Sequence, residues 1–318
     1  MNSMKIKAWR YLSLSLALLV TMVFSSCDDQ DDDMMPESDN IVEVLGEDPN
    51  FSILASAVVA AELDDDLSGT GPFTVFAPTN TAFGDFISDK GLTAEALLGS
   101  ADLADILSYH VVSGNVTSSE VEAGAVNSLT GEKFYISVDP DGGVWINGNS
   151  MVTAVDQMAN NGVIHTLDYV ITAPTKSIAE IAVESSTAST PEFTQLVAAL
   201  TRAGLVEAVS GGSDDDLTVF APTDAAFQDL YDALGVSGVD EIDVELLTDV
   251  LTYHVVPARA FSQDLRDGAS LPTLLEGKNL TVDLPGLMIN ESSLVPSMLN
   301  IHATNGVIHV IDQVMLPE

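Results

Sequence analysis

Five histidines are the side chains of this 318-residue sequence best suited to chemistry: His110, His165, His254, His302 and His309. A pair of imidazoles in each half of the chain could ligate a metal or act as general bases. No third ligand recurs beside them, and neither the spacing of a helical HxxxH nor that of a Cys/His cluster is present. We therefore predict no metal site and expect neutral, buried imidazoles that pin loops to the core, with metal ligation as the alternative.

Carboxylates are the second group that could hold a ligand, because their oxygens suit calcium. Aspartate triplets occur at 31–33, 64–66 and 214–216, and Asp139-Pro140-Asp141-Gly142 resembles the start of a calcium loop. Ser150 stands where such a loop would place its bidentate glutamate. We expect no cofactor, and at most weak calcium binding at the surface.

The motifs of the common hydrolases and nucleotide-binding enzymes are missing from the sequence. It contains no G-x-S-x-G elbow, no H-E-x-x-H, no phosphate loop and no G-x-G-x-x-G. Paired carboxylates carry little information in a chain this acidic. We therefore predict a protein without a catalytic site.

The first 26 residues form a separate segment. Lys5, Lys7 and Arg10 make a basic head, Tyr11 to Phe24 is an apolar run too short for a comfortable membrane span, and small residues precede Cys27. Cys27 is the only cysteine, so no disulfide framework can form. It lies where a bacterial lipoprotein signal places the cysteine that is acylated and becomes the new N-terminus. An uncleaved anchor and an ordinary signal cleaved nearby are the alternatives.

The charge of the remaining chain is strongly negative. Without residues 1–26, seven Lys and Arg stand against 48 Asp and Glu, a formal net charge of −41. Such a chain repels nucleic acid and anionic headgroups, which excludes DNA and RNA as partners. The charge favours divalent cations, cationic partners or solubility in a salty medium.

An aspartate-rich run occupies residues 27–38, directly after the signal. Like charges keep such a run extended, so we expect a tether. The run also resembles the acidic tag of some surface-exposed lipoproteins, which predicts an exported protein anchored in the outer membrane and facing outward. Retention at the inner membrane by the aspartate after the cysteine is the alternative.

The rest of the chain consists of two tandem copies of one domain. Three words recur in the same order, each 144 residues apart: TVFAPT at 74–79 and 218–223, SYHVV or TYHVV at 108–112 and 252–256, and NGVIH at 161–165 and 305–309. Such a repeat indicates tandem structural units, and we place them at 39–173 and 174–318. Two linked binding sites raise avidity without any new contact, so the duplication favours a binding or adhesion protein.

Helices and strands alternate in each copy. Phe73–Ala77 and Leu217–Ala221 are predicted strands that end at prolines, after which Thr79 and Thr223 can cap a helix. Helical spacing also predicts helices at 49–63, 101–109, 191–205 and 244–253. Alternation over residues 163–172 and 307–315 predicts final strands that turn His165 and His309 toward the apolar side. Each copy is therefore an α+β domain.

These words resemble the signature of the fasciclin family. TVFAPTNTAF (74–83) and TVFAPTDAAF (218–227) are similar to its first homology segment, and NGVIHTLDYVI (161–171) and NGVIHVIDQVMLP (305–317) to its second. Tyr109-His110 and Tyr253-His254 match the tyrosine-histidine motif between them. The resemblance covers nearly the whole mature chain. It implies two tandem wedges, each of about seven short β-strands flanked by helices, and a role in extracellular adhesion.

The resemblance also implies the candidate contact residues. In the family the tyrosine-histidine segment and an aspartate beside an aliphatic residue are implicated in adhesion, which points to these positions: Tyr109, His110, Leu167, Asp168, Tyr253, His254, Ile311 and Asp312. Strand geometry turns the two aspartates away from the apolar face. The alternatives are buried structural histidines and a solvated strand face.

We therefore predict a surface lipoprotein, attached to the membrane through the lipid on Cys27, that adheres to an extracellular protein or polysaccharide. A glycan- or ligand-binding module that serves polymer degradation is the second hypothesis, and a hydrolase with an unrecognised site is a remote third. Outside the repeated words the copies differ, as at Phe134-Tyr135 against Asn279-Leu280, and Trp145 has no aromatic counterpart. If the two domains bind different things, we expect the difference there.

Overall fold

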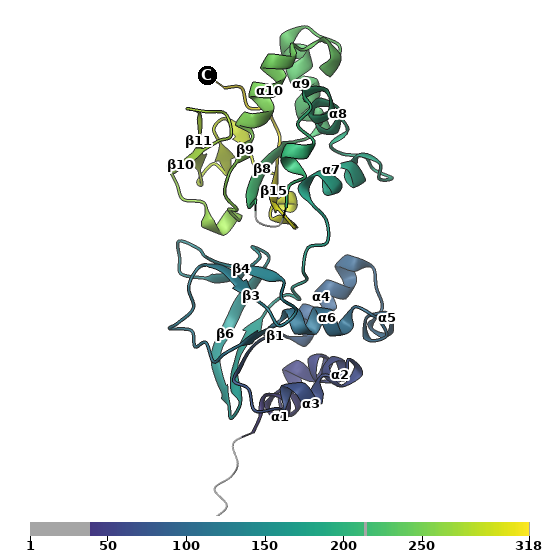
Figure 1. The fold of residues 1–318 in the computed structure, drawn as a ribbon, viewed down its shortest axis with the longest axis vertical. Helices are drawn as coiled ribbons and strands as arrows, with labels where there is room; N and C mark the ends of the chain where they lie inside the picture. Colours follow the sequence, from purple (N-terminus) through teal and green to yellow (C-terminus); the bar gives the residue numbers. More distant parts are fainter. Residues whose placement is uncertain (1–38, 213–214, 318) are drawn as a thin grey trace, which may run out of the picture. The chain divides into compact units, whose positions relative to one another are not determined.

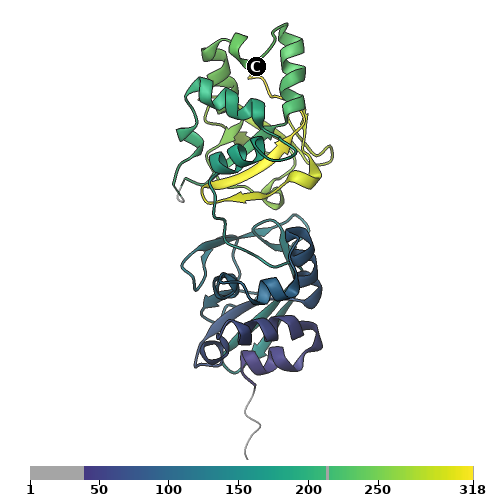
Figure 2. The ribbon, with the colours of Figure 1, turned by 90° about the vertical axis from the view of Figure 1, so that its right-hand side faces the viewer.

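The computed structural model describes residues 39–212 and 215–317, so the predicted signal, Cys27 and the acidic tether lie outside the described residues. Two similar α+β domains follow one another along the chain. In each of them the helices gather on one side of the strands (Figure 1), and the view turned by 90° looks onto those helices (Figure 2). The α+β prediction is confirmed.

The first domain places its helices mainly before its strands in the sequence. Its helices are α1 (Ile41–Glu47), η1 (Pro49–Phe51), α2 (Ser52–Ala60), α3 (Asp64–Leu67), α4 (Asn80–Lys90), α5 (Ala94–Leu98) and α6 (Leu103–Tyr109). Its strands are β1 (Phe73–Pro78), β2 (Val111–Ser113), β3 (Gly124–Asn127), β4 (Lys133–Val138), β5 (Val144–Ile146), β6 (Ser150–Ala159) and β7 (Gly162–Leu167). The seven strands form one sheet in the order β2-β1-β7-β6-β5-β4-β3, as expected for a fasciclin-like wedge.

The second domain repeats this plan with one difference. Its helices are α7 (Ile178–Ser186), α8 (Thr194–Ala203), η2 (Glu207–Val209), α9 (Asp224–Leu234), η3 (Val239–Glu241), α10 (Val244–Tyr253), η4 (Ser262–Asp264) and η5 (Pro296–Met298). Its strands are β8 (Leu217–Pro222), β9 (Val255–Val256), β10 (Ser270–Pro272), β11 (Asn279–Asp283), β12 (Met288–Ile289), β13 (Ser292–Ser293), β14 (Ile301–Ala303) and β15 (Gly306–Ile311). They form two four-stranded sheets, β10-β11-β12-β13 and β14-β15-β8-β9, joined by a bridge between Leu294 and Ile311.

The split has a local cause. Where the first domain has the continuous ten-residue strand β6, the second has β13, the 3-10 turn η5 and β14. Pro296 opens that turn, and proline cannot donate a ladder hydrogen bond inside a sheet. Strand β6 is itself irregular, with register shifts against β7 between Val152 and Gln157.

The predicted helix caps are confirmed. The hydroxyl of Thr79 accepts the backbone N–H of Ala82 at 3.2 Å, and that of Thr223 accepts the N–H of Ala226 at 3.1 Å. Each threonine thus satisfies one of the unpaired N–H groups at the start of α4 or α9. The threonine that ends each TVFAPT word fixes the direction of the helix after the strand.

The Asn-Gly pairs join each final strand to the helices. Asn161 accepts the N–H of Ile41 and donates to the carbonyls of Leu67 and Gly69, which ties α1 and α3 to the sheet. A Cβ on the following Gly162 would collide with the carbonyl oxygen of Phe73 on the parallel strand β1. Asn305 and Gly306 repeat both roles in the second domain.

The final strands are more deeply buried than the sequence predicts. They lie between two neighbours, β7 between β1 and β6, and β15 between β8 and β14. His165 and His309 face the core as expected, but Ile164 and Val310 on the opposite side of the strands are buried as well. A strand covered on both faces shows no clean alternation, and β7 ends at Leu167, short of the predicted range.

None of the helices formed by residues 39–212 and 215–317 has the length and apolar character needed to cross a membrane.

Candidate functional site

Tyr109 is a buried residue that holds the backbone of β4 and the side chain of Asn147 in place. Its side chain is 1 % exposed, and its hydroxyl donates to the carbonyl of Lys133 at 2.8 Å and accepts from the Asn147 amide at 3.2 Å. Asn147 in turn accepts the N–H of Tyr135 at 2.9 Å and holds a positive φ of 50°. Burial raises the pKa of the Tyr109 phenol, so the hydroxyl remains a neutral hydrogen-bonding group.

His110 ties the end of α6 to the segment after β7. Its Nε2 accepts the N–H of Ile171 at 3.1 Å, so Nδ1 carries the proton and donates to the carbonyl of Ile106 at 2.7 Å. Burial lowers the pKa of His110 to about 4, against a smaller opposite effect of the Ile106 carbonyl. The imidazole is therefore neutral near pH 7.

The second domain repeats this network atom by atom. Tyr253 accepts from the Asn290 amide at 2.9 Å and donates to the carbonyl of Asn279 at 3.1 Å. His254 accepts the N–H of Met315 at 3.0 Å and donates to the carbonyl of Val250 at 2.7 Å. The tyrosine-histidine motif thus positions an asparagine and a chain segment at the same place in both copies.

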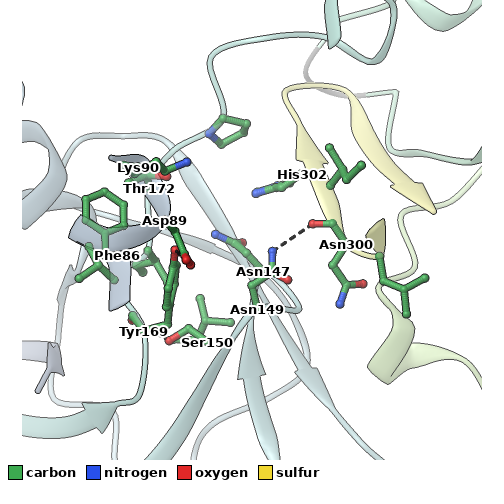
Figure 3. Close-up of a pocket in the computed structure, with 16 residues that line it drawn as sticks. Phe86, Asp89, Lys90, Asn147, Asn149, Ser150, Tyr169, Thr172, Asn300 and His302 are labelled. Carbon is green, nitrogen blue, oxygen red and sulfur yellow. Dashed lines mark hydrogen bonds between the residues drawn. The ribbon is translucent and has the colours of Figure 1, made fainter. Parts of the chain in front are cut away.

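Those positioned groups line a hollow beside each tyrosine-histidine network, and the first of these hollows is completed by residues of the second domain. The first hollow, of about 540 Å³, is lined in the first domain by Asn147, Asn149, Ser150 and Tyr169 among others (Figure 3). The second hollow, of about 820 Å³, is lined at the corresponding place by Asn290, Glu291, Ser292 and Gln313 among others. Ser150 donates to the carbonyl of Tyr169 and Ser292 to that of Gln313, which confirms the correspondence.

The predicted contact residues do not lie together on the surface. Six are buried: Tyr109, His110, Leu167, Tyr253, His254 and Ile311. In the folded domains these six side chains are not available to a partner, because they fill the core or hold the hollows from behind. The geometry matches the alternative reading of His110 and His254 as structural residues.

Asp168 and Asp312 are the two exposed members of the predicted set. Asp168 accepts the N–H of Met151 at 2.7 Å, and Asp312 accepts that of Ser293 at 2.7 Å. Partial burial raises the pKa of the Asp168 carboxyl, while the Met151 N–H acts in the opposite direction. Asp312 also accepts the Ser292 hydroxyl at 3.4 Å. Each carboxylate keeps free acceptor capacity, since these hydrogen bonds use only part of it.

The remaining motif histidines are also hydrogen-bonded at both ring nitrogens. His165 contacts the carbonyl of Val116 and accepts the N–H of Asp156, and His309 contacts the carbonyl of Ala260 and accepts the N–H of Asn300. Burial lowers the pKa of His309 to about 4. Within the described residues, no three His, Cys, Asp or Glu side chains are grouped so that they could hold a metal ion.

The Asp139 carboxylate is engaged in hydrogen bonds within its own turn. Asp139 accepts the N–H groups of Asp141 and Gly143 and the indole N–H of Trp145 at 2.7–2.9 Å. These hydrogen bonds form the turn between β4 and β5. One of them involves Trp145, the aromatic residue that has no counterpart in the other copy.

Contacts around Arg259, which no sequence motif predicted, join the two domains. This side chain is 3 % exposed and pairs with Asp216 at 2.9 Å. Its guanidinium also donates to the carbonyls of Ala303, Thr304 and Gly306. Tyr135 of the first domain completes the cluster, and the described residues accordingly belong to one compact unit.

Asn300 and its neighbours add polar contacts at this junction. The Asn300 amide donates to the carbonyl of Gly148 at 2.8 Å, and Asn149 donates to the carbonyl of Asn300 at 3.0 Å. Gly148 has a φ of 68°, and a Cβ there would lie 2.7 Å from atoms of Asn300 and Phe261. The approach of the two domains at this point requires glycine.

The residues that form the junction between the domains are not repeated at the equivalent positions of the other copy. The N–H groups of Tyr135 and Thr281 bond the equivalent Asn147 and Asn290, so Thr281 stands where the first domain has Tyr135. The pairing of Tyr135 with Leu280 expected from the sequence is therefore one residue out of register. By strand pairing, Met158 stands where the second domain has His302. Differences between copies were the available signal for this junction.

Comparisons with known proteins agree with the repeat. A family model described as "Fasciclin domain" matches residues 49–173 and 191–317. Protein sll1483 of Synechocystis sp. is 46% identical over 137 residues, covering 42% of this chain and 73% of that protein. Transforming growth factor-beta-induced protein ig-h3 of Oryctolagus cuniculus is 31% identical over 287 residues, covering 88% of this chain but only 40% of that protein.

A solved FAS1 domain pair from the insect cell adhesion molecule fasciclin I aligns with 84% of this chain and 95% of its own, at 18% identity and a TM-score of 0.40.

Proposed function

The chain belongs to the fasciclin family, and from that premise we propose that it is a cell-surface lipoprotein that mediates adhesion, without catalysis, through its two domains. The family match spans both copies, and fasciclin domain proteins are adhesion-related. The partner is a matrix component, a polysaccharide or the surface of a neighbouring cell.

One observation carries the non-catalytic part of the proposal. All four histidines of the repeated motifs have both ring nitrogens hydrogen-bonded to backbone groups. A general base needs a free nitrogen within reach of a substrate proton. These imidazoles instead hold the scaffold. The fifth histidine, His302, has its pKa lowered to about 3 by burial, which makes it a poor general base near pH 7.

The membrane attachment rests on the N-terminal sequence. Cys27 follows a basic head and an apolar run, and an aspartate-rich tether leads from it to the first domain. Acylation of Cys27 would fix the chain to the membrane, and the tether would hold the domains away from the bilayer. The outer-membrane, outward-facing location is part of the same proposal.

The contacts are proposed on the exposed surface. Asp168 and Asp312 occupy equivalent places after the final strands, and each accepts a backbone N–H from the neighbouring strand, β6 or β13. A partner with cationic or hydroxyl donors would suit these carboxylates. A cationic partner would also be attracted by the overall negative charge of the chain. Both domains then present one such carboxylate, and binding through both would multiply the affinity.

Three measurements test this proposal. Metabolic labelling with an alkyne fatty acid should label the wild-type chain and not Cys27→Ala, and protease added to intact cells should degrade the labelled chain. Beads coated with residues 28–318 should then retain matrix or neighbouring cells. Unlabelled wild-type protein would contradict the lipid anchor, and bare-bead levels of retention would contradict adhesion.

A second function is favoured by one observation, the first hollow with its amide and aromatic lining. In this alternative the chain is a surface glycan-binding module that assists polymer degradation. Sharp selectivity for one polysaccharide on a glycan array would favour it over general adhesion.

A further inference from the structure

The first hollow is built from both domains. Phe86 and Asp89 come from α4, Asn147 from the turn between β5 and β6, Ser150 from the start of β6, and Tyr169 from the segment after β7. The second domain closes the opposite side with Asn300, which precedes β14, and with His302 on β14. Figure 3 shows the His302 ring directed into the hollow, facing the asparagines.

His302 is the unexplained group in this hollow. Its Nε2 is buried and makes no hydrogen bond, unlike the ring nitrogens of the four motif histidines. The ring is held in place by edge contacts with Phe261 and Tyr135, at centroid distances of 5.4 and 5.9 Å. A buried polar atom without a partner costs stability, so such an atom in a cavity wall indicates a ligand that would satisfy it.

The ionisation state of His302 narrows the choice of ligand. Burial lowers its pKa to about 3, and the nearby Arg259 guanidinium adds to the shift. The ring is therefore neutral at physiological pH, and Nε2 offers a neutral donor or acceptor. A hydroxyl group can meet either role, because it both donates and accepts.

The facing wall offers matching chemistry. Tyr169 lies edge-on to Phe86 at a centroid distance of 6.1 Å and donates its hydroxyl hydrogen to Asp89 at 3.0 Å. The amides of Asn147 and Asn149 face the space between Tyr169 and His302 (Figure 3). Apolar ring surface beside a few fixed amides and hydroxyls is the lining that orients a small polar ligand.

We propose that the first hollow binds a neutral oligosaccharide segment, whose hydroxyls meet His302 and the facing amides and whose apolar face lies against Tyr169. This assignment rests on the proposed function, since a polysaccharide is one of its partners. An acidic polysaccharide is disfavoured because the mature chain carries a formal charge of −41. The volume of about 540 Å³ is in the range of small-molecule sites.

The second hollow supplies an internal comparison. Gln313 stands there in place of Tyr169, and Leu230 on α9 corresponds to Phe86 on α4. No unpartnered buried nitrogen lies among its lining residues as described. The oligosaccharide site is therefore assigned to the first hollow alone.

The test is binding of labelled cellohexaose, xylohexaose, mannohexaose and trigalacturonic acid to residues 28–318. His302→Leu removes the ring nitrogens, and Tyr169→Gln introduces the residue of the other copy. For the neutral oligosaccharide that binds, each variant should raise Kd about tenfold, the loss of roughly one hydrogen bond or ring contact. Met158→Leu, the position equivalent to His302 in the first domain, should leave Kd unchanged.

Thermal unfolding of each variant shows whether the fold is kept. The melting temperature of His302→Leu should match or exceed that of the wild type, because the change removes an unsatisfied buried atom. Absence of neutral-oligosaccharide binding at millimolar concentration overturns the assignment, as does binding unaffected by both variants or preference for the acidic probe. Retention of matrix or cells by beads coated with residues 28–318, measured in parallel, reports on adhesion itself. Failure of this site and failure of the adhesion proposal are therefore distinguishable.

Discussion

The guanidinium of Arg259 lies 4.3 Å from the centre of the Tyr135 ring, across the junction between the two domains. Both residues also contact Asp216: Arg259 through Nε at 2.9 Å and Tyr135 through its hydroxyl at 3.0 Å. A cation over an aromatic ring, with a shared carboxylate, couples two surfaces that neither domain offers alone. The pair of domains is thereby held together by residues that the repeat does not duplicate.

Tyr135→Leu should weaken this coupling. The change removes the ring under Arg259 and the hydroxyl bond to Asp216, at a cost of about 1–3 kcal/mol. Calorimetry should show the unfolding of the two domains separating into two transitions. Thr281→Val, which removes a hydroxyl at the equivalent place, is the control. An unchanged single transition for Tyr135→Leu would contradict a coupling role.

Gly148→Ala should disturb the junction more than an ordinary glycine substitution. The new Cβ would press on Asn300 and Phe261 at 2.7 Å, in addition to the strain of a positive φ. Gly91→Ala is matched in domain and φ but has nothing within 4 Å of the new atom. We expect Gly148→Ala to lower the melting temperature clearly further than Gly91→Ala. Equal losses would argue against a close approach here.

Tyr109→Phe tests whether the tyrosine-histidine motif is scaffold. The variant leaves the Asn147 amide and the Lys133 carbonyl without their partner, which should cost about 1–3 kcal/mol of unfolding free energy. Bead retention, measured well below the melting temperature, should stay at the wild-type level. Lost retention with an unchanged unfolding free energy would instead identify Tyr109 as a contact.

The unfolding free energy should fall as the pH is lowered from 6.5 toward 4. His110, His254 and His309 have their pKa lowered to about 4, and His302 to about 3. Below pH 6.5 the unfolded chain binds protons that the folded chain refuses, so each histidine removes about 1.4 kcal/mol per pH unit. Their stabilising contribution is fully present above pH 6.5.

Urea titrations at pH 7.5, 6 and 5 measure this dependence. His302→Leu should reduce the slope by one histidine's share, which separates the imidazole contribution from that of the carboxylates. A flat profile between pH 6.5 and 5 would mean that the imidazoles are solvated in the folded protein.

Much of the fold could be predicted from the sequence because local signals and tertiary structure agree there. The proline that ends β1 or β8 and the threonine that follows it act within four residues, and the caps at Thr79 and Thr223 are as expected. Helix α1 was not predicted because it is short. The split of the second sheet at Pro296 was not predicted because it becomes visible only when the long strand β6 is compared with its counterpart.

The junction could not be predicted, for a physical reason. Arg259, Tyr135 and His302 meet only after both domains have folded, and nothing local in their neighbourhoods distinguishes them from surface residues. His110 and His254 recur in the sequence because each makes the same hydrogen bonds inside its own domain. What is repeated in this chain builds the scaffold, and what differs between the copies joins the domains and shapes the first hollow.

Attachment of intact cells is the most direct test of the central proposal, that this chain is an adhesion protein of the cell surface. Cells in which its gene is deleted should attach less to matrix, polysaccharide or neighbouring cells. Re-expression of the wild type should restore attachment, and Cys27→Ala, which cannot be lipid-anchored, should not. Attachment that is the same with and without the chain would contradict the account.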